Sequence, residues 1–406
     1  VQLRYSFRLY PDAVQRGVLA RAFGCARVVF DEVVQVREDA RGRGTIPYGG
    51  WAAQASDYPG QAVAGACLAE RGLHSGAPAV PARRGGRVPE LLRIPQGHTQ
   101  GPEGGRPRFK SRKDHRQSVR FTANARWKIP EAGRLDLSKI GAVKVKWSRT
   151  LPATPFSVTV IKDAAGRYFA PFVIETDPAT DQAWMPGSDR AIGIDLGLTH
   201  FAVLSDGTKI DSPRFLRRAE KKLKKTQQDL CRKQKGSKNR DKARLKVARA
   251  HAKVADARRE FHHQLSTRLI SENQGIAVED LSVAALCRTR LAKPVHDAGW
   301  SSFISMPEYK AQRYGRTLVK VDRFEPTSQT CSTCGTKDGP EPLHVREWTC
   351  SACGTVHDRD HNAAINVKVA AGLAVSACGA PVRPGAIPAQ REEAGSHGFP
   401  TGNRAA

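Results

Sequence analysis

The sequence predicts a multidomain protein that combines α+β and α/β parts. Three observations favour this class: strand-like segments with period-two alternation before residue 175, apolar strands interleaved with long helical segments over residues 191–325, and two Cys-x-x-Cys pairs before the last predicted helix. A chain of 406 residues is long enough for two or three domains and at least one full hydrophobic core.

The charge of the chain is strongly positive. Lys and Arg outnumber Asp and Glu by 66 to 39, which gives a formal net charge of +27. A polyanion is therefore the expected partner, and nucleic acid is the first candidate. The sequence contains no apolar run that could span a bilayer and no signal-peptide pattern, so we expect no membrane partner and a cytoplasmic, nucleoid-associated protein.

Residues 1–45 are predicted to form a strand and a helix, a start of helix-turn-helix type. Residues 2–10 alternate apolar and polar side chains, and Pro11 then opens the helix, where its missing amide hydrogen costs nothing. We expect one buried helical face, formed by Val14, Val18, Ala22, Phe23, Ala26, Val29, Phe30 and Val33.

Residues 46–105 differ in character from both flanks. Gly, Ala and Pro accumulate there and hydrophobic periodicity disappears, which predicts a disordered insert. Because so long a structureless loop is unusual inside a compact lobe, our hypothesis is that a frameshift has replaced a helical segment. Codons for residues 91–100, read one nucleotide later, can encode a segment whose composition is more typical of a folded protein than the given one. The nucleotide sequence of the gene tests the frameshift hypothesis.

Residues 106–175 are predicted to form a small β-barrel or sandwich that the N-terminal strand joins. The expected strands are 118–122, 127–129, 143–147, 157–162 and 168–174, with a hairpin turn over 163–166. A basic run with one aromatic residue precedes them. Its cations could form a solvated face, but in so basic a chain they favour contact with a phosphate backbone: Arg106, Arg108, Lys110, Arg112 and Lys113.

After a linker at 176–190, residues 191–325 are predicted to form an α/β core. Two of its apolar strands contain a carboxylate, Asp195 in 191–198 and Glu279 in 276–281. A charge in a buried strand is costly unless it is paired or bound to a cation. Further strands are expected at 201–204 and 318–321, and a helix at 300–314.

Residues 214–270 are predicted to form two long helices joined around Gly236. Leucine and other apolar residues recur every seven positions, which is typical of a helical hairpin with a coiled-coil-like seam. The cations between them could simply be solvated, but their excess favours a nucleic-acid track that includes Lys221, Lys222, Lys224 and Lys225.

The cysteines predict a metal site. The spacing of Cys331, Cys334, Cys350 and Cys353 is that of a four-thiolate zinc ribbon, which we place at residues 326–356. The other cysteines are scattered, and we interpret them as small buried or incidental residues: Cys25, Cys67, Cys231, Cys287 and Cys378. Residues 374–406 are predicted to be a disordered tail.

Three carboxylates stand out by context: Asp195 and Glu279 near strand ends, and Asp360 at the start of the last helix, in the segment 357–373. Phosphodiester hydrolysis by two divalent ions uses such oxygen ligands, and carboxylates on rigid elements suit Mg²⁺ or Mn²⁺. Spacing alone leaves open whether the three converge.

Seven motifs make the sequence resemble the TnpB/OrfB proteins of bacterial insertion sequences, relatives of the type V CRISPR effectors. They are RLYP at 8–11, GRPRFK at 105–110, GIDLG at 193–197, VEDL at 278–281, DAGW at 297–300, EYKA at 308–311 and the stretch 331–366.

The resemblance implies an RNase H-like (RuvC) nuclease domain with an inserted zinc ribbon, preceded by a wedge-type β-barrel with a helical recognition insert. It also implies RNA-guided DNA cleavage beside a transposon-adjacent motif, with Asp195, Glu279 and Asp360 as catalytic, metal-holding acids. The implied partners are a guide RNA from the transposon end and double-stranded target DNA. We expect a monomer or weak dimer.

This chain departs from the family pattern at two places: residues 46–105, and Pro307 within a predicted helix. Near the last helix, Asp358 is interpreted as a structural partner of Arg359 or the ribbon, and His357 is not counted as a zinc ligand. Two other functions stay open. The chain could be a catalytically impaired zinc-ribbon nucleic-acid-binding protein that regulates transposition, or a transposase that performs strand transfer itself.

Overall fold

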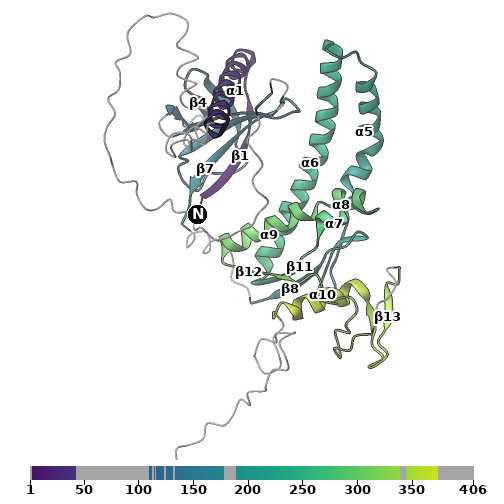
Figure 1. Cartoon of the computed structure of the whole chain (residues 1–406). Coiled ribbons are helices and arrows are strands. Elements are labelled where there is room, and N and C mark those ends of the chain that lie inside the picture. The colour runs from purple at the N-terminus through teal and green to yellow at the C-terminus, as the bar shows by residue number, and fades with distance from the viewer. Residues whose placement is uncertain are drawn as a thin grey trace, which may run out of the picture. The chain divides into compact units, whose positions relative to one another are not determined.

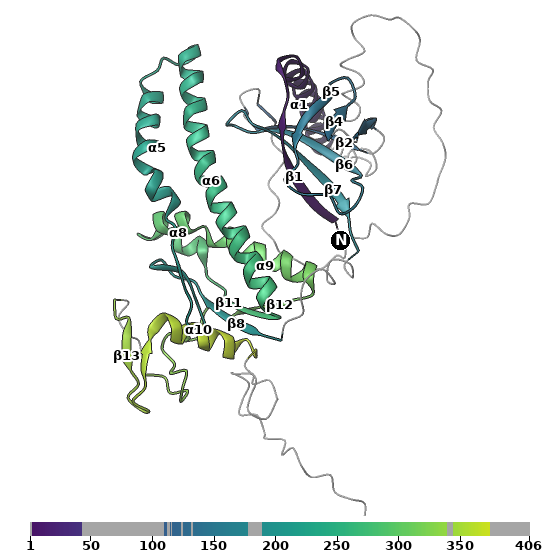
Figure 2. The same cartoon turned by 180° about the vertical axis from the view of Figure 1, so that it is seen from behind.

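The computed structural model describes residues 2–42, 109–111, 114, 116–122, 125–130, 133–177, 189–338 and 344–373. The predicted insert at 46–105 and the predicted tail at 374–406 lie outside these residues. The frameshift hypothesis concerns the insert and therefore stays a hypothesis. The chain divides into two compact units, 1–177 with 232–249, and 178–231 with 250–406 (Figures 1 and 2).

The first unit contains an antiparallel sheet of seven strands in the order β2-β6-β7-β1-β5-β4-β3. β1 lies between β7 and β5, which confirms that the N-terminal strand joins this sheet. Of these strands, the sequence did not predict β4. No pairing between β2 and β3 is present among the described residues, so closure into a barrel stays a prediction. The strands are β1 (Gln2–Tyr10), β2 (Gln117–Thr122), β3 (Trp127–Lys128), β4 (Arg134–Leu137), β5 (Gly141–Lys146), β6 (Ser157–Lys162) and β7 (Tyr168–Glu175).

Helix α1 (Ala13–Gly42) follows β1 directly. Its start is capped reciprocally, because the Gln15 amide donates to Asp12 Oδ1 at 2.8 Å and the Asp12 amide donates to Gln15 Oε1 at 3.1 Å. The predicted face is partly wrong: Val14 is 77% exposed, and the fully buried apolar positions are Leu19, Phe23, Ala26 and Val34. Leu19 and Phe23 pack in the core of the seven-stranded sheet, which rotates the buried stripe away from Val14.

Cys25 of α1 is disulfide-bonded, so the interpretation of the scattered cysteines as incidental is wrong for this residue. Cys231 and Cys287 are free thiols.

The second unit is built on a five-stranded sheet in the order β10-β9-β8-β11-β12. β8, β11 and β12 run parallel, whereas β9 and β10 are added antiparallel at one edge. The predicted strands are confirmed and the short β10 is additional. Their bounds are β8 (Ala191–Asp195), β9 (His200–Leu204), β10 (Lys209–Asp211), β11 (Gly275–Glu279) and β12 (Thr317–Val321).

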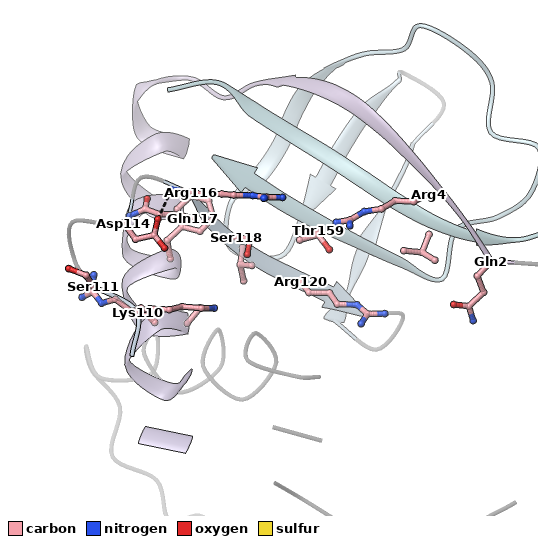
Figure 3. A pocket seen from close by; sticks show the side chains of 15 residues that line it. Gln2, Arg4, Lys110, Ser111, Asp114, Arg116, Gln117, Ser118, Arg120 and Thr159 are labelled. Atoms are coloured by element: carbon pink, nitrogen blue, oxygen red, sulfur yellow. Dashed lines mark hydrogen bonds between the residues drawn. The ribbon is translucent and has the colours of Figure 1, made fainter. Parts of the chain in front are cut away.

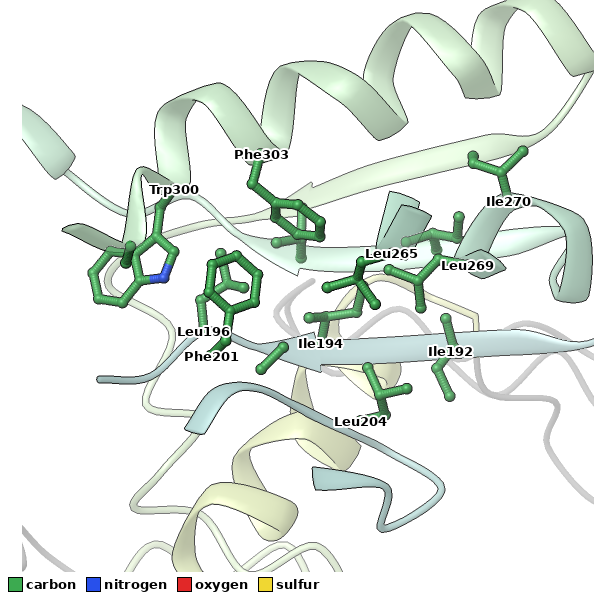
Figure 4. Close-up of a cluster of buried hydrophobic side chains, with 14 of the residues drawn as sticks. Ile192, Ile194, Leu196, Phe201, Leu204, Leu265, Leu269, Ile270, Trp300 and Phe303 are labelled. Atoms are coloured by element: carbon green, nitrogen blue, oxygen red, sulfur yellow. The ribbon is translucent and has the colours of Figure 1, made fainter. Parts of the chain in front are cut away.

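Helices cover both faces of this sheet. Ile194 and Val278 pack on one face against Leu269 of α6 and Phe303 of α9 (Figure 4). Alternation along the strands turns Ala277 to the other face, where it packs with Val367 of α10. The helices of this part are α5 (Phe215–Cys231), α6 (Lys238–Glu272), α7 (Val283–Leu286), α8 (Ala292–Ala298), α9 (Trp300–Tyr314) and α10 (Arg359–Ala370).

The two long predicted helices are confirmed as α5 and α6. Gly236 between them has φ +85°, a left-handed conformation that glycine adopts at little cost, and Ser237 caps α6 by accepting from the Arg240 amide at 3.1 Å. At the other end of α5, the buried Asp297 of α8 accepts the amides of Leu216 at 2.7 Å and Arg217 at 3.0 Å. Asp297 therefore supplies the N-terminal cap of a distant helix. Within the described ranges, no helix is both long and apolar enough to cross a membrane.

Candidate active site

Asp195 and Glu279 end neighbouring parallel strands. Ile194 of β8 pairs with Val278 of β11, so the next residue of each strand, Asp195 and Glu279, lies at the same edge of the sheet. Because Ile194 and Val278 face α6 and α9, alternation turns both carboxylates toward the opposite face, which α10 covers. The sheet thus brings together two acids that are separated by more than eighty residues in sequence.

The close approach of α10 adds the third acid. A β-carbon on Gly193 would lie 2.1 Å from the Ala364 carbonyl oxygen and 2.8 Å from Lys368 Cβ, so only glycine lets the helix approach β8 this closely. The helix runs antiparallel to β8, and its first turn, which contains Asp360, reaches the strand end that bears Asp195.

The pKa shift of Asp195 is consistent with three neighbouring carboxylates. Burial raises the pKa of Asp195 to about 7, with further contributions from the negative charges of Asp360 and Glu279, while Arg346 and Arg359 act in the opposite direction. Burial also raises the pKa of Glu279. A desolvated group of like charges is one that a cation would stabilise.

Arg346, between the cysteine pairs, was not among the residues predicted from sequence. Its Nη1 lies 3.0 Å from Asp360 Oδ1, and its Nη2 lies 3.5 Å from Thr199 Oγ1. An arginine in a basic chain gives no sequence signal of its own, and only the folding of the ribbon against α10 places it beside an acid of the trio.

Asp358 has the predicted structural role, and the ribbon is one of its partners, because the backbone of Asp358 pairs with that of Glu347 in a two-stranded sheet. Its Oδ1 caps α10 by accepting the His361 amide at 2.9 Å, and its Oδ2 pairs with Lys209 Nζ at 2.6 Å. The side-chain pair with Lys209 was not predicted, because only the folded chain brings the short strand β10 alongside Asp358.

The four predicted cysteines form one cluster. The ligand atoms of Cys331, Cys334, Cys350 and Cys353 lie within 4.8 Å of one another, and all four are free thiols. In the part of the chain that the structure describes, this is the only group of three or more His, Cys, Asp or Glu side chains found close enough together to hold a metal ion.

The two cysteine knuckles have the same geometry. In each, the backbone carbonyl of the first cysteine accepts the amide of the glycine four residues later, Gly335 or Gly354, at 2.9 Å, and both glycines have positive φ. The strands β13 (Glu347–Thr349) and β14 (Val356–Asp358) pair beside the second knuckle. The buried His357 lies outside the cysteine cluster, with its Nε2 3.0 Å from Cys331 Sγ, where it can orient that sulfur.

Two asparagines of α10 attach the ribbon to this helix. Asn362 Nδ2 donates to the Thr330 carbonyl at 2.8 Å and Asn366 Nδ2 donates to the same oxygen at 2.6 Å. Asn362 Oδ1 also accepts the Ser332 amide at 2.9 Å. The helix that bears Asp360 is therefore tied to the first cysteine knuckle.

The predicted nucleic-acid contacts are described only in part. The α5 lysines are all exposed: Lys221, Lys222, Lys224 and Lys225. Lys110 lies with its Nζ 3.9 Å from the centre of the Phe30 ring, and its amide donates to Asp31 at 2.6 Å. The rest of the basic run lies outside the described residues: Arg106, Arg108, Arg112 and Lys113.

The first unit also contains a basic pocket of about 410 Å³ that sequence reasoning missed (Figure 3). It lies between α1 and the strands β1, β2 and β6, and five cationic side chains face a single acid, Asp114, around it: Arg4, Arg27, Lys110, Arg116 and Arg120. The cations come from three separated stretches of sequence, and of the five only Lys110 belongs to the basic run that the sequence pointed to.

Convergent carboxylates on an α/β sheet, a four-cysteine ribbon and a basic surface together define a protein of the nucleic-acid-processing class. Family models agree with this. A model described as "Probable transposase" (OrfB of IS605) matches residues 172–290, a "Helix-turn-helix domain" model matches 1–45, and a "Cas12f1-like, TNB domain" model matches 300–367.

Similar proteins extend over nearly the whole chain. A Streptomyces pristinaespiralis protein named "Putative RNA-guided DNA endonuclease" is 41% identical over 391 residues, covering 95% of this chain and 92% of the relative. An Escherichia coli K12 protein of the same name, InsQ, is 27% identical over 94% of this chain and 95% of its own length. The chain belongs to the TnpB/OrfB family of transposon-associated proteins.

Among solved structures, a Cas12f1-sgRNA-target DNA complex matches 62% of this chain and 59% of its own chain, with 14% identity and a TM-score of 0.39.

Proposed function

We propose that this protein is a metal-dependent DNA endonuclease directed by a guide RNA and encoded by a transposon. The observation that supports it most is the convergence of Asp195, Glu279 and Asp360 at one edge of the second unit's sheet. The names of the relatives supply the substrate class, and the +27 charge suits a protein that holds both RNA and DNA.

The acid trio fits divalent cations with a preference for oxygen ligands, Mg²⁺ or Mn²⁺. Asp195, Glu279 and Asp360 would hold them, since hard carboxylate oxygens suit ions that accept few protein ligands and keep several waters. When bound, such ions supply water activation and stabilisation of the leaving oxygen in phosphodiester hydrolysis. The chain itself holds the acids on rigid elements. The guanidinium of Arg346 lies beside Asp360, where it can bind a phosphate.

The cysteine cluster fits a structural Zn²⁺. The sulfur separations of 3.7 Å for Cys331–Cys353 and 3.6 Å for Cys334–Cys350 lie close to the ~3.8 Å edge of a tetrahedron with ~2.3 Å Zn–S bonds. Four thiolates leave no open position for substrate, so we assign this metal a role in folding the ribbon.

The remaining parts of the proposal concern nucleic-acid contacts. We infer that the basic pocket of the first unit and the α5 lysines bind phosphate backbones of the guide RNA and of double-stranded target DNA. We also propose that the seven-stranded sheet serves as the wedge-type barrel and reads a short transposon-adjacent motif, and that the protein works at the nucleoid as a monomer or weak dimer.

The decisive test compares Asp195→Ala with wild type in cleavage of a DNA target by the protein–guide RNA complex in Mg²⁺ or Mn²⁺. Loss of cleavage with unchanged RNA affinity is expected. The matched control is Asp211→Ala, an exposed carboxylate of the same sheet, which should cleave normally. Cleavage by the Asp195→Ala protein would contradict the assignment. RNA and DNA binding without cleavage by wild type would instead favour the regulatory, catalytically impaired alternative.

A further inference from the structure

Phe324 is exposed where most phenylalanines would be buried. At 86% exposure it is the most exposed large apolar side chain in the described part of the chain. It belongs to the loop between β12 and Cys331, and its neighbours Asp322, Arg323 and Glu325 are exposed charged residues. A single aromatic ring among charges is not the apolar patch of a protein interface, but it does suit a partner that is both aromatic and charged.

The loop starts at the edge of the sheet where the acids lie. β12 runs parallel to β11 and Val321 pairs with Glu279, so Phe324 follows three positions after the strand residue opposite a proposed metal ligand. The amide of Asp280 donates to the Val321 carbonyl at 2.9 Å, and Arg323 forms an ion pair with Asp280. One end of the loop is thus attached to the residue that directly follows Glu279.

The other end of the loop is attached to the helix of Asp360. The Thr327 carbonyl accepts Asn366 Nδ2 at 2.8 Å and Asn362 Nδ2 at 3.4 Å. Between the two attachments, Asp322 Oδ1 accepts the Phe324 amide at 2.8 Å, which fixes the turn. A ring on a backbone held this way loses little conformational entropy when it binds a partner.

From this geometry we propose that Phe324 is a stacking platform for an unpaired DNA base beside the scissile phosphate. The proposal rests on the proposed function and adds a substrate-positioning residue to it. Stacking on an aromatic ring accepts every base, because each base has a π-face. This tolerance is what a guided enzyme needs, since the guide pairing and not the protein reads the target sequence.

The test measures DNA binding without cleavage. The full-length chain with Asp195→Ala is titrated into an oligodeoxythymidylate that contains one 2-aminopurine, whose fluorescence falls when it stacks. Adding Phe324→Ala should weaken binding about tenfold and remove the quenching, whereas Phe324→Trp should retain both. Leu291→Ala, which alters a 43% exposed apolar side chain of the same unit, is the control and should change neither.

Equal affinity and quenching with Phe324→Ala would overturn the proposal. So would weak binding by Phe324→Trp, or no binding by the Asp195→Ala parent. The zinc content of each variant checks that the neighbouring ribbon is intact. The proposed function is judged separately by cleavage: a wild-type chain that stacks bases through Phe324 but never cuts DNA would contradict the nuclease assignment and leave the stacking role standing.

Discussion

A β-carbon on Gly193 would lie 2.1 Å from the carbonyl oxygen of Ala364, so the contact between β8 and α10 depends on the absence of a side chain at this position. Gly193→Ala should push α10 away from the strand and separate Asp360 from Asp195. We expect a loss of about 1–3 kcal/mol in the free energy of unfolding and at least a tenfold slower cleavage, measured by denaturant titration and by target cleavage.

Gly17→Ala is the matched control for this prediction, because no atom lies within 4 Å of a β-carbon built on Gly17 in α1. It should stabilise the protein by about 0.5–1 kcal/mol, since alanine favours a helix over glycine. Normal cleavage by Gly193→Ala would show that the approach of α10 does not set the site.

Arg346→Ala removes a cation that competes with metal ions for Asp360. Manganese binding, followed by electron paramagnetic resonance, should become tighter, while the free energy of unfolding should change by about 0.5 kcal/mol or less because Arg346 is 52% exposed. Lys293→Ala, which breaks an exposed ion pair with Glu220 of α5, should leave manganese affinity unchanged. Unaltered affinity in Arg346→Ala would speak against a metal site at Asp360.

Cys350→Ser should abolish zinc binding, because serine cannot supply the fourth thiolate of the cluster. We expect about one zinc ion per wild-type chain and almost none in the variant, measured by atomic absorption, together with melting of the ribbon. Cys231→Ser alters an exposed free thiol of α5 and should retain the metal. Stoichiometric zinc in Cys350→Ser would contradict the ribbon assignment.

Lys310 gives the protein a pH dependence at alkaline pH. Its buried ammonium donates to the His263 carbonyl at 2.9 Å and to the hydroxyls of Ser266 and Thr267 at 2.7 Å each, and desolvation lowers its pKa from 10.5 to about 8. Between these two values the unfolded chain binds a proton that the folded chain has released. The free energy of unfolding should therefore rise as pH increases from about 8 to 10.5.

Lys310→Met should remove this alkaline rise, and at pH 7 it should lose about 1–3 kcal/mol of stability because the His263 carbonyl and the hydroxyls of Ser266 and Thr267 lose their donor. Lys320→Met alters an exposed lysine paired with Glu308 and should leave the slope intact. The measurement is denaturant unfolding over this pH range, and the same slope in Lys310→Met would refute the assignment.

The sequence predicted most elements of the second unit and the identity of its candidate ligands. Apolar strands that end in an acid can be recognised from sequence, because a carboxylate is rare in a buried run. The two Cys-x-x-Cys pairs form the cluster that their spacing indicated. In the first unit the sequence did not predict β4. It also predicted Val14 in the buried face of α1, because a helix rich in Val and Ala has no single clear apolar stripe.

The sequence motifs indicated the family by resemblance. Residue types and local periodicity determined the strands that hold Asp195 and Glu279 and the four cysteines that cluster, because these depend on neighbours in sequence. Only the tertiary structure decided that the acids converge, that Arg346 meets Asp360, that Lys209 pairs with Asp358, and that Asn362 and Asn366 fix the loop of Phe324. These contacts join segments far apart in the chain, which the sequence pattern of any one segment does not reveal.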